Sequence, residues 1–283
     1  MIKITECPRD AMQGIHSFIP TNVKAHYINL LLKVGFDRID FGSFVSPKAI
    51  PQMQDTAELV NKLEVGDNST PLLAIIANLR GAQEATQFEQ ISFLGFPFSV
   101  SETFQNRNTN SSIKESLKTV EQIGNHCTRT NTIPLVYLSM GFGNPYGDEW
   151  SAEIVSHYAQ QLIQLGVKDL VLADTTGNSV PENISYLFPL LKKELPNVQW
   201  GIHLHSTQEN SAEKIKAALD AGCDQFDTAL RGFGGCPMAA EKLTGNIATE
   251  TLLNVLKEKD HPYAPFNSYA WEQAREYSLK VFD

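Results

Sequence analysis

Short apolar segments alternate with longer amphipathic segments along the whole chain. The apolar segments are flanked by glycine, proline or polar residues, which is typical of buried β-strands. The segments between them repeat apolar residues at helical spacing, as in Val23, Tyr27, Leu30 and Leu31. We therefore expect strands at residues 2–5, 38–41, 72–76, 90–94, 133–139, 170–173, 200–206 and 225–229, and helices at residues 23–34, 55–63, 82–88, 112–125, 152–165, 181–195, 210–221 and 249–257.

This alternation predicts an α/β protein with a parallel sheet. Eight strand–helix units of about 35 residues each fit a sheet closed into a barrel better than an open sheet. A recurring helix-to-strand turn supports the count, because glycine and a short polar link precede the strand at residues 34–37, 165–169 and 221–224. We expect a single (β/α)8 TIM-barrel catalytic domain over residues 1–283, with the barrel at about 1–258 and a short C-terminal extension at about 259–283. The aromatic residues of this extension are expected to pack across the barrel or against a partner.

Two histidines stand in the seventh expected strand. His203 and His205 are two residues apart, so their side chains project from the same face. Two neutral imidazoles so placed can occupy adjacent positions on one divalent cation, with carboxylate and amide oxygens completing the site. A lone His-x-His pair is more often one buried and one exposed histidine, so the placement of the other reactive residues decides between these interpretations.

The other reactive residues follow the expected strands at their carboxyl ends. In a barrel of this kind all such ends meet at one mouth, where active sites lie. Each residue alone has an ordinary explanation, such as a helix cap or a turn, but their joint placement favours a functional site. The set comprises Arg9, Asp10, Asp40, Asn78, Glu102, Asp174, His203, His205, Cys236 and Asn246.

Composition narrows the function further. A net charge of −9 and a pI near 5.3 disfavour a nucleic-acid-binding surface, which needs a basic stripe. The four cysteines contain no Cys-x-x-Cys pair, so we expect free thiols rather than a zinc site or a disulfide framework. The beginning of the chain lacks the apolar core of a signal peptide, and we expect a cytoplasmic location without a membrane span.

Five motifs carry a family resemblance that covers residues 4 to 253. The chain resembles hydroxymethylglutaryl-CoA lyase, a member of a wider group of metal-dependent barrel lyases and acyl-CoA condensing synthases. The Ser-Phe-Val-Ser-Pro-Lys and Gly-Gly-Cys-Pro runs are the most diagnostic. The motifs are Pro-Arg-Asp with Gln at residues 8–13, Ser-Phe-Val-Ser-Pro-Lys with Pro-Gln-Met at 43–53, Asp-Thr-Thr-Gly at 174–177, His-Leu-His at 203–205, and Gly-Phe-Gly-Gly-Cys-Pro through Thr-Gly-Asn at 232–246.

The resemblance implies a metal-dependent carbon–carbon cleavage. A divalent cation, Mg²⁺ or Mn²⁺, would be held by Asp10, His203, His205 and Asn246. The reaction would split 3-hydroxy-3-methylglutaryl-CoA into acetyl-CoA and acetoacetate, which requires a deprotonated tertiary hydroxyl and a stabilised enolate. The resemblance implies an acyl-CoA substrate. The aromatic C-terminal extension and the habit of the family together predict a homodimer, and, from charge and apolar pattern, neither nucleic acid nor a membrane is expected as a partner.

The resemblance also assigns four catalytic roles. Arg9 would polarise the thioester carbonyl. Asp40, which stands where these lyases commonly have glutamate, would be a base or would orient the base. Cys236 would carry a proton to or from the leaving carbanion, and Asp174 would orient a metal ligand or Arg9.

Two alternatives stay open at this stage. The first is a condensing synthase of the same group, which joins an acyl-CoA to a 2-oxo acid. Against it, the chain ends soon after the expected barrel, without room for the regulatory domain that many such synthases carry. The second is a catalytically silent barrel that serves as a binding module. Metal content distinguishes both enzymes from the silent barrel.

Overall fold

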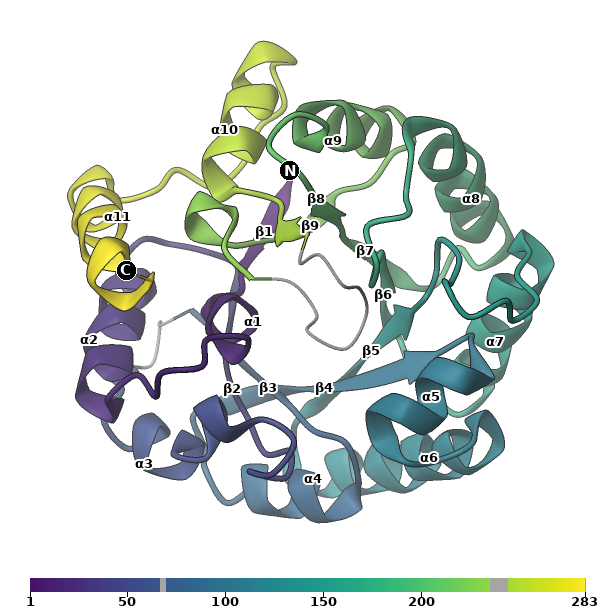
Figure 1. The fold of residues 1–283 in the computed structure, drawn as a ribbon, viewed down its shortest axis with the longest axis horizontal. Coiled ribbons are helices and arrows are strands. Elements are labelled where there is room, and N and C mark those ends of the chain that lie inside the picture. Colours follow the sequence, from purple (N-terminus) through teal and green to yellow (C-terminus); the bar gives the residue numbers. More distant parts are fainter. Residues whose placement is uncertain (67–69, 235–243, 283) are drawn as a thin grey trace.

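Eight parallel strands close into a barrel in the computed structural model, which describes residues 1–66, 70–234 and 244–282 (Figure 1). The predicted TIM barrel is therefore confirmed. A separate two-stranded sheet pairs β8 with β10. The barrel strands are β1 (Lys3–Glu6), β2 (Arg38–Ser43), β3 (Leu72–Ile75), β4 (Ile91–Ser99), β5 (Ile133–Ser139), β6 (Asp169–Ala173), β7 (Gln199–His203) and β9 (Gln225–Thr228), and the added pair is β8 (His205–Ser206) and β10 (Gly245–Asn246).

Helices surround the barrel on its outer side (Figure 1). Their apolar faces pack against the strands, and polar residues stand at several helix starts. The clearest start is at Ser112, whose hydroxyl and the side chain of Glu115 form a capping box. The helices are α1 (Pro8–Gln13), α2 (Thr21–Leu32), α3 (Thr56–Val60), α4 (Leu79–Ala85), α5 (Glu102–Thr109), α6 (Ile113–Thr130), α7 (Ala152–Gln164), α8 (Pro181–Glu194), α9 (Ser211–Asp220), α10 (Thr249–Glu258) and α11 (Ser268–Phe282), with short 3-10 turns η1 (Pro51–Met53) and η2 (Leu230–Gly232).

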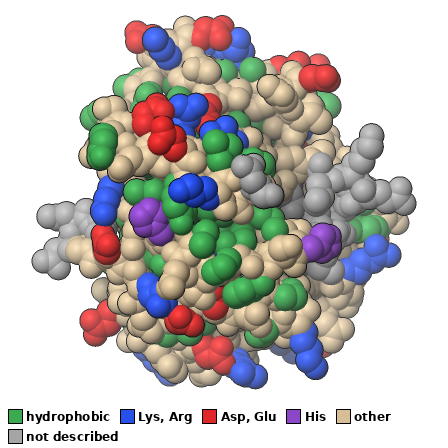
Figure 2. Space-filling view, turned by 60° about the vertical axis from the view of Figure 1, so that its left-hand side comes forward, with side chains coloured by type: hydrophobic (Ala, Val, Ile, Leu, Met, Phe, Trp, Pro, Cys, Tyr) green, Lys and Arg blue, Asp and Glu red, His purple; other side chains and the backbone are tan. Residues whose placement is uncertain are grey.

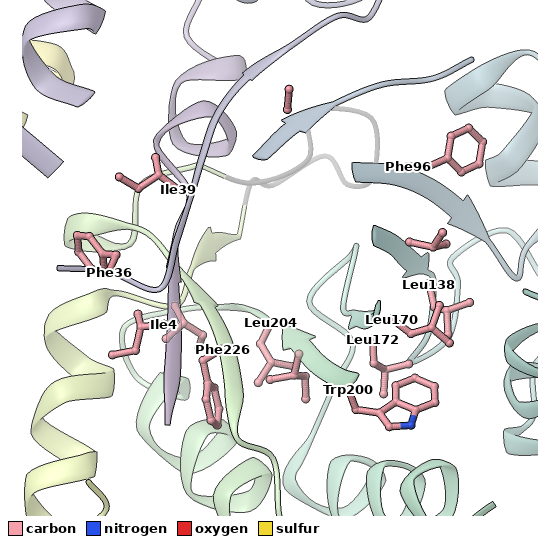
Figure 3. Close-up of a cluster of buried hydrophobic side chains, with 14 of the residues drawn as sticks. Ile4, Phe36, Ile39, Phe96, Leu138, Leu170, Leu172, Trp200, Leu204 and Phe226 are labelled. Carbon is pink, nitrogen blue, oxygen red and sulfur yellow. The ribbon is translucent and has the colours of Figure 1, made fainter. Parts of the chain in front are cut away.

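Each strand is buried on both faces, as a parallel barrel requires. On β5, Val136 and Leu138 join the large core between strands and helices, of which Figure 3 shows part. Leu135 and Tyr137 of the same strand point the opposite way and pack inside the barrel with Ile75 of β3. This alternation explains why a strand such as β5 is apolar on both faces.

Four segments differ from the sequence-based expectation. The seventh strand, expected at residues 200–206, is divided into β7, which ends at His203, and β8, which begins at His205 and belongs to the two-stranded sheet. Strand β4 was expected to end at residue 94 but runs to Ser99. Gly95 lies inside this strand, where a Cβ would come within 2.6 Å of the Ile75 side chain inside the barrel. Residues 8–13 and 102–109, where no helix was expected, form α1 and α5. Pro8 suits the first turn of a helix, where its missing N–H is no loss, and Ser101 caps α5.

The C-terminal segment packs on the barrel itself. Helix α11 lies beside α2 (Figure 1), and the rings of Phe266 and Trp271 cluster with Phe36, with centroids 4.7 Å apart between Phe36 and Phe266. The first of the two expected positions for the aromatic tail is therefore the one observed. Tyr269 stays exposed.

The surface carries charged side chains of both signs. Side chains of both charges are interspersed over the face shown in Figure 2. Among the described residues, no helix is both long and apolar enough to cross a membrane.

The barrel is closed by its first and last strands. Four consecutive residue pairs join β1 to β9, from Lys3 with Gln225 to Glu6 with Thr228. Beyond this ladder, the buried Glu6 carboxylate accepts a hydrogen bond of 2.7 Å from the Leu230 backbone N–H and one of 2.7 Å from the Thr249 hydroxyl. One side chain thus ties the beginning of the chain to the segments that follow β9. Burial raises the pKa of Glu6 to about 8 despite these two hydrogen bonds.

We predict that Glu6 makes the stability of the fold pH-dependent. Because its pKa is raised in the folded state, the folded protein retains a proton that the unfolded chain has lost. Its contribution to the free energy of unfolding is therefore fully present below about pH 4.5 and is lost as pH rises to about 8, by at most about 1.4 kcal/mol per pH unit. Urea unfolding of the wild type and of Glu6→Gln across this range measures the difference. The gap between the two curves should change with pH, whereas the exposed Glu58→Gln control should run parallel to the wild type.

Candidate active site

The residues expected at the barrel mouth come from both ends of the chain. Asp10 lies on α1, directly after β1, and His203 is the last residue of β7. His205 lies on β8, where it pairs in register with Asn246 of β10. The four expected metal ligands are thus supplied by three separate stretches of sequence, and the short β8–β10 pairing brings the last of them into place.

The two histidines lie side by side, with ring centroids 5.1 Å apart. The Nδ1 atom of His203 is 3.1 Å from a carboxylate oxygen of Asp227. The Nδ1 atom of His205 is 2.9 Å from the carbonyl oxygen of Asp174, so that nitrogen carries the proton and Nε2 presents a lone pair. The Nε2 atom of His205 is buried and has no hydrogen-bond partner in the described part of the chain, although it lies 4.0 Å from Asp10 Oδ2.

These atoms fit a divalent cation. Asp10, His203 and His205 each offer one ligand atom, all within 4.8 Å of one another and all buried. A buried nitrogen acceptor without a donor is costly unless something else uses its lone pair. The mixture of imidazole nitrogen and carboxylate oxygen is suitable for Mg²⁺ or Mn²⁺.

The fourth expected ligand, Asn246, contacts Asp10 through its amide nitrogen. Asn246 Nδ2 donates to Asp10 Oδ2 and to the Phe233 carbonyl, at 2.8 Å in each case. Its amide oxygen is therefore the atom left for a cation. A second cluster that shares His203, formed with Cys7 and Asp227, is a weaker candidate, since burial raises the pKa of the Cys7 thiol and disfavours the thiolate that binds metals.

Arg9 lies between two carboxylates. Its guanidinium makes a bidentate ion pair with Asp40, with Nε 3.0 Å from Oδ2, and Nη1 donates to Asp10 Oδ1 at 3.1 Å. Gln13 bridges the same pair, because it accepts from Arg9 and donates to Asp10. Burial would raise the pKa of Asp10, but the positive charge of Arg9 holds it well below its usual range. Asp10 is thus a carboxylate at any physiological pH.

Asp40 is the most deeply buried of these groups. Both of its oxygens accept from Arg9, and burial nevertheless raises its pKa to about 6. In this geometry the carboxylate orients Arg9. Its oxygen atoms accept from the Arg9 guanidinium, and Asp40 does not line the cavity next to the candidate metal ligands.

Asp174 contributes to the site mainly through its backbone. Its carboxylate accepts hydrogen bonds from Ser179 and from Lys214, and Arg9 is not among its partners in the described chain. Its carbonyl oxygen, in contrast, accepts from the His205 ring.

Two other expected mouth residues have structural contacts. The Asn78 side chain caps α4, and the Glu102 carboxylate accepts from the Ile113 backbone N–H. Cys236, the expected proton carrier, lies outside the described residues.

Sequence interpretation missed three residues that support the cluster. Asp227 is in register with His203 in the neighbouring strand, and Lys214 reaches the site from α9. Gln13 was part of a quoted motif but was given no role. Asp227 had a detectable signal, since a carboxylate in a strand as short and buried as β9 needs a partner. Lys214 had none, because a lysine on an amphipathic helix is expected to face solvent.

A cavity opens above the cluster. Its floor contains Arg9, Asp10 and both histidines, and its walls are largely apolar. Wall residues include Val45, Ile50, Ile75, Pro97, Phe104 and Tyr137. Such a cavity offers polar groups for chemistry and apolar surface for a carbon chain.

Barrel topology and a buried cluster of cation ligands at the mouth define a barrel enzyme with a candidate metal centre. The family model described as HMGL-like matches residues 2–271. The chain belongs to this HMGL-like family.

Individual relatives agree with this assignment. A hydroxymethylglutaryl-CoA lyase of Bacillus subtilis is 32% identical over 256 residues, which is 89% of this chain and 84% of that protein. A mitochondrial hydroxymethylglutaryl-CoA lyase of Gallus gallus is 34% identical over 262 residues, which is 90% of this chain and 85% of that protein.

Solved structures give the same result. An HMG-CoA lyase from Acinetobacter baumannii, in complex with coenzyme A and 3-methylmalate, superimposes with a TM-score of 0.92 at 29% identity, covering 100% of this chain and 91% of that one. The carboxyl transferase domain of Rhizobium etli pyruvate carboxylase, at 14% identity and a TM-score of 0.71, shares the fold alone.

We predict that His205→Ala abolishes stoichiometric Mn²⁺ binding, because it removes the one buried nitrogen whose lone pair is unused in the described chain. The barrel should stay folded, since its apolar core lies below the cluster. Isothermal titration with Mn²⁺, with circular dichroism to check folding, measures both effects. The matched control is His157→Ala on α7, an exposed histidine. Full Mn²⁺ occupancy in the folded His205→Ala protein would contradict the ligand assignment.

Proposed function

We propose that this chain is a divalent-metal-dependent lyase that cleaves 3-hydroxy-3-methylglutaryl-CoA into acetyl-CoA and acetoacetate. The observation that carries the proposal is the buried, unpartnered His205 Nε2 beside the Asp10 carboxylate, at the floor of a mostly apolar cavity. The identity of the proposed substrate comes from the lyases named above, because the chain covers 84% and 85% of those two relatives. The cation is Mg²⁺ or Mn²⁺, and its ligands are Asp10, His203, His205 and Asn246.

The reaction sets clear demands on the site. A proton must leave the tertiary hydroxyl, the adjacent carbon–carbon bond must break, and the electron pair must pass to an enolate of acetyl-CoA that then takes up a proton. A cation bound by these ligands would supply Lewis acidity, which lowers the pKa of a substrate hydroxyl. Asp10, Asn246 and the histidines hold and orient that cation.

Arg9 acts on the thioester side. It is a permanent cation, fixed by Asp10 and Asp40, and it also lines the cavity. A guanidinium preorganised in this way stabilises negative charge as it develops on the thioester oxygen, without having to reorient during the reaction. Asp40 positions Arg9, and Asp174 positions His205 through its backbone carbonyl.

The remaining roles rest on the family resemblance. Cys236 delivers a proton to the enolate carbon, which yields the methyl group of acetyl-CoA. A homodimer in the cytoplasm, with a place in leucine degradation and ketone-body formation, completes the proposal.

The two alternatives are less well supported. A condensing synthase would bind a 2-oxo acid, but the curated relatives reported above are hydroxymethylglutaryl-CoA lyases. A catalytically silent barrel gives no reason for the buried Asp10–His203–His205 cluster, whose ligand atoms are close enough to hold one cation.

The first test is the release of acetoacetate. The purified protein, supplied with Mg²⁺ or Mn²⁺ and 3-hydroxy-3-methylglutaryl-CoA, should release acetoacetate and acetyl-CoA in equal amounts, and a chelator should stop the release reversibly. A lyase needs no 2-oxo acid, so the assay contains none. Metal-loaded protein that releases no acetoacetate, or release that is indifferent to the chelator, would overturn the proposal.

Arg9 gives a second test. Arg9→Lys keeps the charge but loses the bidentate contact with Asp40, so kcat should fall about a hundredfold to a thousandfold with a much smaller change in KM. Mn²⁺ affinity measured on the same protein separates chemistry from metal positioning. A loss of affinity in proportion to activity would mean that Arg9 serves mainly to fix Asp10. The exposed Arg80→Lys on α4 is the control.

A further inference from the structure

A lysine is buried behind the candidate metal centre. Lys214 lies on α9, and only 1% of it is exposed. Lysine is almost never buried to this extent without partners, because its head group loses its hydration. The next lysine along the same helix, Lys216, behaves in the ordinary way and pairs with Glu258 at the surface.

The head group of Lys214 has three acceptors, which belong to two segments: the turn after β6 and the strand β8. Nζ donates to the His205 carbonyl at 2.8 Å, to the Asp174 carboxylate at 3.2 Å and to the Gly177 carbonyl at 3.3 Å. An ammonium group has three protons, so this environment satisfies all of them. Lys214 therefore joins the turn after β6 to the strand β8 that follows β7.

Both of these segments hold one expected metal ligand, His205, in position. The backbone of His205 is held directly, through its carbonyl oxygen. Its ring is held indirectly, because the carbonyl oxygens of Asp174 and Thr175 lie 2.9 and 3.2 Å from its Nδ1 atom. Lys214 thus fixes the position of the His205 main chain and, through the Asp174 turn, the direction in which its ring points.

A purely structural role would not require this arrangement. Replacing a buried ion pair by apolar residues of similar volume is often neutral for stability or even stabilising. A pair that served stability alone would thus gain little from ionic groups. What the Lys214 ammonium provides, and a methionine would not, is a simultaneous hydrogen bond to the residue that carries the unpartnered Nε2 atom.

We propose that Lys214 is a positioning residue for the metal centre, acting through His205. This inference rests on the proposed function, since it takes His205 as a metal ligand. Partners that orient a metal ligand typically contribute tenfold to a hundredfold to metal affinity. Lys214 itself touches neither the metal ligand atoms nor the cavity.

The test removes the pair while keeping the charge balanced. Lys214→Met alone would leave the Asp174 carboxylate buried and unpaired, which disturbs stability and adds a negative charge near the cation. The double variant Lys214→Met, Asp174→Asn leaves the net charge of the pair at zero and keeps an amide oxygen for the Ser179 backbone N–H. Lys216→Met, two residues away on the same helix, is the matched control.

Two quantities are measured on each protein: the Mn²⁺ dissociation constant by isothermal titration, and the melting temperature without metal. The double variant should melt close to the wild type but bind Mn²⁺ about 10- to 100-fold more weakly, whereas Lys216→Met should match the wild type in both. A folded double variant with Mn²⁺ affinity within twofold of the wild type would overturn the proposal. A merely structural role would lower the melting temperature and leave the affinity of the folded protein unchanged.

A second pair of substitutions covers a failure to fold. Lys214→Gln, Asp174→Asn retains two polar side chains that can pair with each other, but the glutamine is one bond shorter than lysine and cannot also hold the His205 carbonyl. Its Mn²⁺ affinity should fall as well, and wild-type affinity would again overturn the proposal. The wild type shows which idea has failed: if it binds no Mn²⁺, the proposed function is wrong, whereas unchanged binding in the variants contradicts only the role of Lys214.

Discussion

The pairing of β1 with β9 is the constraint on which the rest of the structure depends. It converts a row of strands into a closed ring, so that no edge strand remains in the barrel. Closure also sets where the first and last loops meet. Asp10 and Asn246 are far apart in sequence yet lie within a hydrogen bond of each other, because the strands before them are neighbours in the ring. The Glu6 carboxyl group stabilises the same junction through its hydrogen bonds with Leu230 and Thr249.

Closure brings charged groups into a space with little water, and the fold balances them in pairs. Arg9 stands between Asp40 and Asp10, His203 faces Asp227, and Lys214 faces Asp174. Buried charges are tolerated when they are paired and hydrogen-bonded. One nitrogen, His205 Nε2, is left out of this balance among the described groups of the mouth, and the proposed cation would complete it.

Much of the fold was predictable because strand and helix spacing are local properties of the sequence. All eight barrel strands lie at the expected apolar segments, although β4 runs on to Ser99 and the seventh expected strand is divided into β7 and β8. The closeness of His203 and His205 was predicted, but the two histidines lie on two strands rather than on one. The helices α1 and α5 were not predicted, because both are short and Pro8, which begins α1, is also a residue that ends strands. Side-chain partners across the barrel could not be predicted in this way. The contact of Asp40 with Arg9 and the burial of Lys214 depend on how the helices pack against the barrel. The residue pattern of a single strand or helix does not determine that packing.

The hydrogen bond between Asp10 and Asn246 also fixes the order in which the molecule can be completed. A growing chain carries Asp10 almost from the start, but it meets its amide partner only after nearly the whole barrel has been synthesised. A complete ligand set cannot exist before that moment. A cation that binds only the native state stabilises that state by mass action. Metal binding would therefore stabilise the finished barrel but no earlier folding intermediate. Without the metal, the folded protein would then have a lower free energy of unfolding.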